Sequence, residues 1–235
     1  MNRQQCSDEL ELNGFTVVRD CLPSTTVAML LEQILQVGPC TVARSRGGQL
    51  YAVRNLLTAV PQIKSLAFSE PLQGLARNLL GSQARPVKGI LFDKHETSNW
   101  KVPWHQDQII TVQNYAEAPG FGPWSTKHGF HAVQPPVEVL EQMIAFRIHL
   151  DDCSVINGAL KVIPGSHLQG KLSAEQISQY RKQAAVMCEA RMGDVLIMRP
   201  LLLHQSSAGS RPSHRRVIHL EYAATDLPGD LKWPE

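Results

Sequence analysis

The chain has 235 residues, 43% of them hydrophobic and 19% charged, which is the composition of a folded globular protein with a sizeable core. Its 23 basic and 21 acidic side chains nearly cancel, to a formal net charge of +2, so the sequence predicts no electrostatic footprint for nucleic acid or for a membrane surface. The polar N-terminus and the absence of a long apolar run argue against a secretory signal and a transmembrane helix, so we expect a cytoplasmic protein.

The first third of the chain is predicted to be mainly helical. A short strand is expected at 14–20, where β-branched and aromatic residues cluster, and a turn with a helix cap follows at 22–24. Apolar residues recur at helical spacing over 25–36. The segment 40–55 is ambiguous, with a turn at 45–48 and a possible strand at 49–53. Prolines in a first helical turn and Gly81 as a stop signal predict two further helices, at 61–68 and 71–80.

After Gly81 the pattern changes from helices to short strands. A chain with helices first and many strands afterwards is typical of an α+β protein whose second part is a β-barrel or sandwich. We therefore expect one domain over 1–235, with a helical part at about 1–82 and a β core at about 83–225. The strands are predicted at 86–94, 102–112, 142–150, 158–163, 186–190, 195–199 and 216–222.

Two segments interrupt the predicted strands. The stretch 114–136 is rich in proline, glycine and aromatic residues, has no clear period and is longer than a connection needs, which favours a lid over a substrate. The segment 173–180 has the pattern of a capping box, with Ser173 as N-cap and Gln176 three residues later, and is predicted to open a short surface helix.

A possible metal site begins at His105 and Asp107. If Gln106 lies in a strand, the two flanking side chains point to the same face, because side chains alternate across a pleated strand. Together with one more imidazole, for which His204 is the candidate, they would form the two-histidine, one-carboxylate set typical of non-haem Fe(II) oxygenases. Alone the His-x-Asp pair is a weak signal in a chain with nine histidines.

Several further motifs occur in a fixed order around these residues. They are Leu91-Phe92-Asp93-Lys94, Trp104-His105-Gln106-Asp107, Arg147-Ile148-His149-Leu150-Asp151-Asp152, the run from Asn157 to His167 that ends in Pro-Gly-Ser-His, Gly193-Asp194, His204-x-Ser206 and Arg215. In this order the chain resembles the phytanoyl-CoA dioxygenase family of Fe(II)- and 2-oxoglutarate-dependent oxygenases. The resemblance runs from about Gly14 to Tyr222. It implies a double-stranded β-helix, or jelly roll, with flanking N-terminal helices.

The resemblance also implies roles for individual residues. His105, Asp107 and His204 would be the iron ligands. Arg215, eleven residues after the second histidine, would bind the far carboxylate of 2-oxoglutarate, because a guanidinium can donate two parallel hydrogen bonds. A register slip of one residue would give this role to Arg216 instead. Two more cosubstrate contacts are implied, for the Ser206 hydroxyl on the same face as His204 and for Lys94, whose alternative is a solvated strand end.

The implied cofactor is Fe(II), with 2-oxoglutarate and O2 as cosubstrates. The implied reaction hydroxylates an unactivated C–H bond of a small-molecule metabolite and releases succinate and CO2. A carboxylate at Asp107 also disfavours halogenation, since related halogenases have a small residue there. The alternative is a non-catalytic jelly roll that binds a metal or 2-oxoglutarate as a sensor or scaffold protein. Neither the identity of the substrate nor an oligomeric state follows from the sequence.

Other candidate residues lie outside this set. Trp104, Trp124 and His128 are predicted to meet the substrate, the last two from the long segment at 114–136. His167 belongs to a turn that in the family closes a loop without binding iron. Arg147 and His149 share a face under strict alternation, so either both line the barrel interior or a bulge intervenes.

Overall fold

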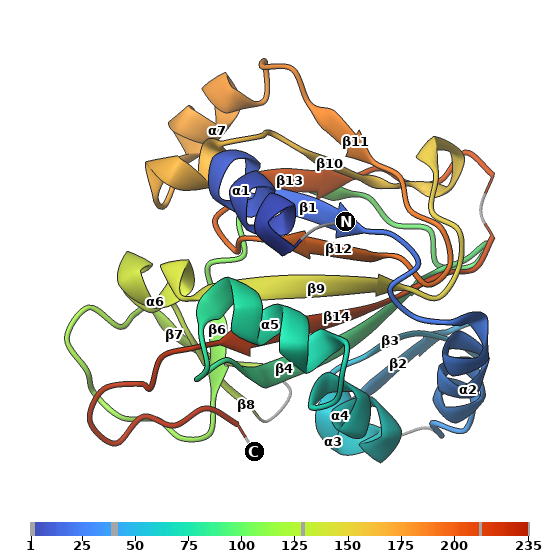
Figure 1. Cartoon of the computed structure of the whole chain (residues 1–235), viewed down its shortest axis with the longest axis horizontal. Coiled ribbons are helices and arrows are strands. Elements are labelled where there is room, and N and C mark those ends of the chain that lie inside the picture. Colours follow the sequence, from blue (N-terminus) through green and yellow to red (C-terminus); the bar gives the residue numbers. More distant parts are fainter. Residues whose placement is uncertain (1–2, 39–41, 128–129, 212, 235) are drawn as a thin grey trace.

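The largest element of the fold is an antiparallel sheet of seven strands in the order β1-β12-β9-β14-β4-β3-β2 (Figure 1). The computed structural model describes residues 3–38, 42–127, 130–211 and 213–234. In sheet order the strands are β1 (Phe15–Val18), β12 (Val195–Met198), β9 (Met143–His149), β14 (Arg215–Ala223), β4 (Arg85–Lys94), β3 (Gln49–Val53) and β2 (Ala43–Arg46). The ambiguous segment at 49–53 is therefore a strand, and it forms a hairpin with β2.

A smaller sheet faces the seven-stranded one and has the order β11-β10-β13-β5. Its strands are β11 (Val186–Cys188), β10 (Leu160–Val162), β13 (His204–Ser206) and β5 (Val102–His105). An apolar cluster that includes Ala145, Leu160 and Leu196 fills one end of the space between the two sheets. Two facing antiparallel sheets that enclose a core form a double-stranded β-helix, or jelly roll, so the predicted fold class is confirmed.

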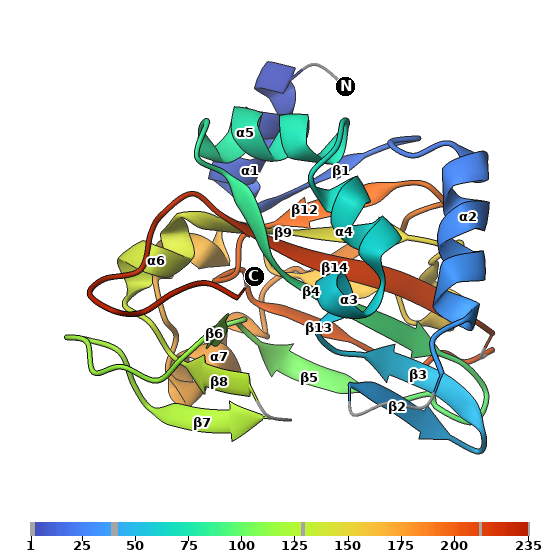
Figure 2. The same ribbon diagram turned by 90° about the horizontal axis from the view of Figure 1, so that it is seen from below.

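Helices cover the outer face of the seven-stranded sheet, on the side of α2 to α5 (Figure 2). The predicted helices are confirmed as α2 (Ser24–Leu35), α4 (Pro61–Ala67) and α5 (Leu72–Leu80). The N-cap of α2 is Pro23, within the cap predicted at 22–24, and it makes no side-chain capping bond. Of the helices that precede β4, two were not predicted, α1 (Arg3–Asn13) and α3 (Leu56–Ala59), because α1 buries only Cys6 and Leu10 and α3 is a single turn.

Alternation along β9 and β14 gives the sheet two different faces. On the outer face Phe146 and Leu220 are buried against the helices, together with Leu30, Leu56 and other apolar side chains. On the inner face of the same strands lie charged and imidazole side chains. These inward residues are Arg147 and His149 of β9 and Arg215, His219 and Glu221 of β14. Arg147 thus lines the barrel interior, one of the two alternatives left by the sequence.

Part of the segment predicted as a lid without regular structure forms strands. β7 (Trp124–Lys127) and β8 (Phe130–Val133) form a hairpin, and β8 also pairs with β6 (Ile110–Val112) to give a third sheet. Its hydrophobic side packs against the C-terminal residues Leu227, Leu231 and Trp233. The long segment escaped prediction because its strands are only four residues each and lie between prolines and glycines.

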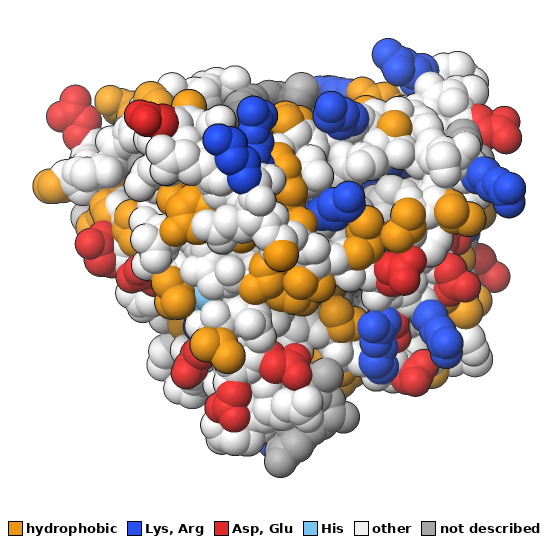
Figure 3. All heavy atoms as spheres, turned by 90° about the horizontal axis from the view of Figure 1, so that it is seen from above, with side chains coloured by type: hydrophobic (Ala, Val, Ile, Leu, Met, Phe, Trp, Pro, Cys, Tyr) orange, Lys and Arg blue, Asp and Glu red, His pale blue; other side chains and the backbone are white. Residues whose placement is uncertain are grey.

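The remaining helices are short and lie between strands. α7 (Ala174–Tyr180) begins with the predicted capping box, in which the Gln176 amide N–H donates to Ser173 Oγ and the Ser173 N–H donates to Gln176 Oε1. The others are α6 (Val137–Glu141) and the 3₁₀ turns η1 (Val155–Asn157) and η2 (Ser166–Gln169). On the face shown in Figure 3 basic and acidic side chains are interspersed with apolar ones. None of the helices in the described ranges is both long and apolar enough to cross a membrane.

Candidate metal centre

Two histidines meet across the smaller sheet. His105 is the last residue of β5 and His204 the first residue of β13, and the two are directly paired in the antiparallel ladder. Their imidazole rings have centroids 4.2 Å apart. Asp107 follows two residues after β5 ends, and its backbone N–H donates to the carbonyl of Pro200 at 2.9 Å. The apolar turn before β13 therefore holds the third side chain against the two imidazoles.

The geometry around Gln106 differs from the predicted regular strand. β5 ends at His105, so Asp107 reaches the same side through a turn that is hydrogen-bonded to Pro200 rather than through strand alternation. Gln106 itself is buried. Its side-chain amide donates to the carbonyls of Leu201 and Gly170 at 2.6 and 2.9 Å, and so ties the turn to two other loops. The side chains of His105 and Asp107 therefore point to the same side as predicted, but a turn after the strand brings them there and not alternation within it.

The three candidate ligands offer atoms that suit a metal ion. His105 Nε2 lies 3.6 Å from one carboxylate oxygen of Asp107, and His204 Nε2 lies 3.6 Å from the other. All three ligand atoms lie within 4.8 Å of one another. Nδ1 of His105 faces the carbonyl of Pro103 at 2.9 Å, and Nδ1 of His204 faces that of Leu202 at 2.8 Å. Because each carbonyl can only accept, both Nδ1 atoms carry a proton, so that in the neutral ring Nε2 has a lone pair for a metal.

The charges at this cluster also favour a cation. Burial lowers the pKa of His204 to about 4, so this imidazole is neutral at pH 7. Burial opposes ionisation of Asp107, but the neighbouring His204 and His105 hold the pKa of its carboxyl group below the usual range. Burial would also lower the pKa of His105, but its contact with Asp107 outweighs burial and raises it. An ionised carboxylate beside two imidazoles is a donor set that suits a divalent metal such as Fe(II).

A small cavity of about 140 Å³ extends from the three ligands into the space between the two sheets. Lys94, Ser206 and Arg215 line it, as does Arg147 from β9. Lys94 is 3% exposed, so it is not a solvated strand end. Its Nζ donates to Ser206 Oγ at 3.0 Å and to the carbonyl of Ser207 at 2.8 Å. All three cosubstrate residues predicted from the sequence therefore share one cavity with the cluster.

The two candidate arginines of β14 point to opposite faces of the sheet. Arg215 is buried in the cavity, where Nη1 donates to the carbonyl of Gly158 and Nε has no hydrogen-bond partner among the described residues. Arg216 lies on the other face and forms a bidentate ion pair with Asp151, with Nε at 2.8 Å from Oδ2 and Nη2 at 2.6 Å from Oδ1. The charge of Arg216 is already compensated, and its side chain does not line the cavity.

Three cations meet in this cavity without an ion pair to any described carboxylate: Lys94, Arg147 and Arg215. Burial, with a further contribution from Arg215 and Arg147, lowers the pKa of Lys94 to about 7. Burial and Arg215 lower the pKa of Arg147 to about 10, and burial also lowers that of Arg215. Buried charges are costly unless they are paired, so this cavity fits an anionic ligand better than it fits water.

Two of the three residues predicted to meet the substrate, Trp104 and Trp124, lie elsewhere. Trp104 alternates with His105 along β5 and packs against the cluster of Ile163, Leu172 and Leu203. Trp124 stacks on Tyr115, with ring centroids 4.7 Å apart, and lines neither cavity next to the cluster. His128 is outside the described residues. His167 Nε2 contacts the carbonyl of Glu11 at 3.1 Å, away from the three ligands.

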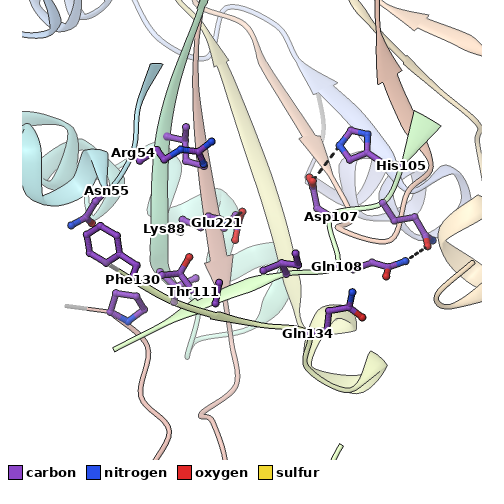
Figure 4. A pocket seen from close by; sticks show the side chains of 16 residues that line it. Arg54, Asn55, Lys88, His105, Asp107, Gln108, Thr111, Phe130, Gln134 and Glu221 are labelled. Atoms are coloured by element: carbon purple, nitrogen blue, oxygen red, sulfur yellow. Dashed lines mark hydrogen bonds and ion pairs between the residues drawn. The ribbon is translucent and has the colours of Figure 1, made fainter. Parts of the chain in front are cut away.

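A second cavity, of about 360 Å³, lies on the other side of His105 and Asp107, and sequence reasoning missed the residues that define it. Figure 4 places Arg54 and Asn55 on one side of this cavity and the two candidate ligands on the other, with Lys88 and Glu221 between. A signal was available for Glu221, because Arg215, Val217, His219 and Glu221 alternate as inward positions of one strand. No comparable signal marks Arg54, which follows a short strand of ambiguous pattern.

Comparisons with known proteins agree with this geometry. The family model of phytanoyl-CoA dioxygenase (PhyH) matches residues 10–217. The solved structure of SnoK, a non-heme alpha ketoglutarate dependent carbocyclase from nogalamycin biosynthesis, has a TM-score of 0.73 at 18% identity and covers 95% of this chain and 84% of its own. A search of curated proteins gave no significant match.

Two further solved structures share the fold. EctD from S. alaskensis, with bound Fe, has a TM-score of 0.73 at 18% identity, over 95% of this chain and 76% of its own. AviO1 from Streptomyces viridochromogenes Tue57 has a TM-score of 0.68 at 22% identity, over 97% of both chains. At these identities the likeness concerns the fold, and the chemistry has to be argued from the side chains.

Proposed function

We propose, from the premise that this chain belongs to the phytanoyl-CoA dioxygenase family of Fe(II)- and 2-oxoglutarate-dependent oxygenases, that it hydroxylates an unactivated C–H bond of a small-molecule metabolite. Iron bound with 2-oxoglutarate and O2 supplies the oxidising power for this step, with release of succinate and CO2. The observation that carries the proposal is the cluster of His105, Asp107 and His204, whose ligand atoms lie within 4.8 Å of one another at the junction of two cavities.

The donor set fits iron. Two imidazole Nε2 atoms and one carboxylate are the ligands of the facial triad of non-haem Fe(II) oxygenases, which leaves positions open for a cosubstrate and O2. The hydrogen bonds from Nδ1 of His105 and His204 to backbone carbonyls fix both rings, so these side chains would hold the metal with little rearrangement. Fe(II) held by His105, Asp107 and His204 is therefore the cofactor that we propose.

The smaller cavity fits 2-oxoglutarate, which carries two carboxylates. Arg215, with a buried Nε that lacks a partner, would bind the carboxylate farther from the metal, and Ser206 and Lys94 would add hydrogen bonds to it. Arg147 would contribute a further positive charge from the neighbouring strand β9. The three cations Lys94, Arg147 and Arg215 would then be neutralised by the ligand instead of remaining unpaired in the interior.

The larger cavity supports a small molecule as the substrate. It reaches His105 and Asp107 from the side opposite the cluster of cations, and its volume of about 360 Å³ is near the lower end for ligand pockets. Phe130 and Ala132 of β8 line it, so the third sheet would cover the substrate and keep water from the reacting carbon.

The test is turnover with a readout of product mass. Purified protein with Fe(II), 2-oxoglutarate and O2 is expected to form succinate, and a metabolite panel followed by mass spectrometry is expected to show a substrate that gains one oxygen. The mass change of the product distinguishes hydroxylation from the reactions of two structural neighbours, which are described as a carbocyclase and an epimerase. Ring closure by oxidation would remove two hydrogens, and epimerisation would leave the mass unchanged, so either outcome would contradict hydroxylation but keep the reaction class.

The alternative is a non-catalytic sensor or scaffold protein that binds metal or 2-oxoglutarate. The complete ligand set and the second cavity beside it argue for an enzyme, because a sensor needs no open space next to the metal. Absence of succinate across the whole panel, in protein that binds Fe(II) and 2-oxoglutarate, would favour the sensor over the oxygenase.

A further inference from the structure

The larger cavity contains one positive charge that the described residues leave uncompensated. Lys88 and Glu221 both line it, but they neutralise one another, with Nζ of Lys88 at 2.7 Å from Oε1 of Glu221. Glu221 Oε1 is also 3.4 Å from Nε2 of His219. Arg54 is the other basic side chain of the lining. It makes no ion pair with a described carboxylate, and its buried Nε has no hydrogen-bond partner among the described residues.

Arg54 is held in place by the end of a sheet strand. Val53, the last residue of β3, pairs with Leu91 of β4 and is buried on the outer, helix-covered face. Alternation turns the next side chain, Arg54, to the inner face, and its backbone N–H donates to the carbonyl of Val42 at 2.9 Å. Asn55 then takes a left-handed conformation, with φ of 53°, that ends the strand and begins α3. The guanidinium is therefore positioned by rigid elements on both sides.

The position of Arg54 matters because it faces the metal centre across the cavity. In Figure 4 Arg54 and Asn55 lie opposite His105 and Asp107. Apart from the Lys88 and Glu221 pair, the lining between them is uncharged, and Gln108, Thr111 and Gln134 are among its hydrogen-bonding groups. A molecule that fills this space would have an uncharged body, with one end at the metal and the other end at the guanidinium of Arg54.

We propose that the substrate of this enzyme is a small organic anion, a carboxylate or a phosphate ester, whose anionic group is bound by Arg54 while its reacting carbon lies at the His105 and Asp107 side of the cavity. This inference rests on the proposed function, because it assigns a substrate class to the same oxygenase site. A planar, permanently charged guanidinium binds carboxylates and phosphates through two parallel hydrogen bonds. Arg54 is then a specificity-determining residue, distinct from Arg215 in the cosubstrate cavity.

The experiment uses matched pairs of small molecules. Each pair contains an acid, either a carboxylic acid or a phosphate monoester, and its uncharged methyl ester or parent alcohol. Succinate formation by the wild type measures KM, and titration calorimetry on protein loaded with Mn(II) and 2-oxoglutarate, which does not depend on turnover, measures Kd. The acids are expected to stimulate 2-oxoglutarate turnover and to bind, and their uncharged partners are expected to do neither.

Three variants connect this preference to one side chain. Arg54→Gln should raise both KM and Kd for the acids by about 10- to 100-fold, the usual loss when a charge-assisted hydrogen bond is removed. Arg54→Lys should recover part of the affinity, because it keeps the charge but loses the bidentate geometry. Arg77→Gln is the matched control, since it removes an exposed arginine from α5 outside the cavity and should leave both constants at the wild-type value.

Several results would contradict an anionic substrate bound by Arg54 but leave the proposed oxygenase function intact. They are equal binding of acids and uncharged partners, an Arg54→Gln variant that binds the acids like the wild type, or a wild type that converts 2-oxoglutarate but is stimulated by no acid in the panel. A wild type that neither binds nor converts 2-oxoglutarate would instead remove the proposed function itself. The Kd of 2-oxoglutarate in Arg54→Gln separates the two cavities, because it should not change if Arg54 serves the substrate alone.

Discussion

The two faces of strands β9 and β14 follow the same alternation but serve opposite purposes. On the outer face Phe146 and Leu220 are completely buried beneath the helices. One residue away along each strand, Arg147 and His219 are also buried, at 8% and 4% exposure, but face a cavity that contains charged and imidazole groups. Burial in this protein therefore has two consequences: on the outer face it stabilises the fold, and on the inner face it prepares a binding site.

The energetic consequence differs between the faces. Apolar burial contributes about 25 cal/mol for each Å² removed from water, so the helix-covered face supplies a large part of the folding free energy. Buried cations without a carboxylate partner contribute nothing comparable and cost free energy until an anion arrives. If this comparison is correct, substitutions on the inner face should damage ligand binding, and substitutions on the outer face should damage stability.

The strongest test of the inner site removes a candidate metal ligand. His204→Ala should weaken Mn(II) or Fe(II) binding by more than about 100-fold, beyond the usual effect of losing a group that only supports a ligand, and should abolish succinate formation. Metal content and calorimetric titration measure the first effect. His167→Ala is the control, because it removes a partly buried histidine that contacts Glu11 and is remote from the cluster. Equal metal affinity in His204→Ala and wild type would contradict the assignment.

The outer face is tested at the residue next to Arg147. Phe146→Ala should lower the free energy of unfolding by about 3 to 5 kcal/mol, because it removes a fully buried ring that packs on Tyr222 and leaves a cavity under the helices. Denaturant titration of the metal-free protein measures this change. A loss below about 1 kcal/mol would mean that the helices do not stabilise the sheet as the packing indicates.

Arg147→Met makes the matched change on the inner face. The substitution replaces a buried cation without a carboxylate partner by an apolar side chain, so the free energy of unfolding of the unliganded protein should stay the same or rise. The Kd of 2-oxoglutarate should rise by about tenfold or more, since a charge next to the ligand is lost. The comparison of the two faces breaks down if Arg147→Met is as unstable as Phe146→Ala.

A smaller effect distinguishes the two arginines of β14. Arg215→Ala should raise the Kd of 2-oxoglutarate by about 10- to 100-fold in Mn(II)-loaded protein and leave metal binding nearly intact. Arg216→Ala should leave that Kd unchanged, because Arg216 pairs with Asp151 on the opposite face. Both side chains of this ion pair, Arg216 and Asp151, are 20% exposed, so stability should fall by only about 1 kcal/mol or less. The reverse pattern would show that the strand register at the site is misjudged.

Much of the outer face could be predicted from the sequence, because long apolar patterns determine it. The helix over 25–36 has apolar residues at helical spacing, and the helices over 61–68 and 71–80 have a proline in the first turn, with Gly81 as the stop signal of the second. All three are present. The phytanoyl-CoA dioxygenase resemblance is likewise confirmed by the family match, since its motifs extend over the whole β core. The one-turn helix α3 and the short strands β7 and β8 were missed, because three or four residues give no reliable period.

The candidate site was only partly predictable, for a different reason. His105, Asp107 and His204 stand in recognisable motifs, and the structure brings them together. Which other side chains join them depends on how strands that are distant in the sequence pair with one another. The local sequence around each residue does not determine this pairing. Arg54 and Glu221 meet in one cavity only because β3 and β14 flank β4. Trp104 was a reasonable candidate by its proximity to His105, but strand alternation turns it to the opposite side.

The finest effect concerns the proton on Lys94. Burial, Arg215 and Arg147 lower the pKa of Lys94 from 10.5 to about 7, so the unliganded protein loses this proton as the pH rises through 7. If the protonated amine binds 2-oxoglutarate, the Kd should be constant below pH 7 and rise by about tenfold per pH unit above it.

The linkage to stability has the opposite sign. Because the folded pKa of Lys94 lies below the unfolded value, the unfolded chain holds more protons above pH 7, and the contribution of Lys94 to stability increases as the pH rises from 7 toward 10.5. In Lys94→Met, neither the Kd of 2-oxoglutarate nor the free energy of unfolding should show this dependence on pH. Calorimetric Kd values and denaturant titrations between about pH 6 and pH 9 measure the two dependences. A Lys94→Met variant with the wild-type slope in Kd would assign the proton to another group. A wild type without any slope would mean that the neutral amine suffices, and that Arg147 and Arg215 alone provide the charge that distinguishes the inner face from the outer one.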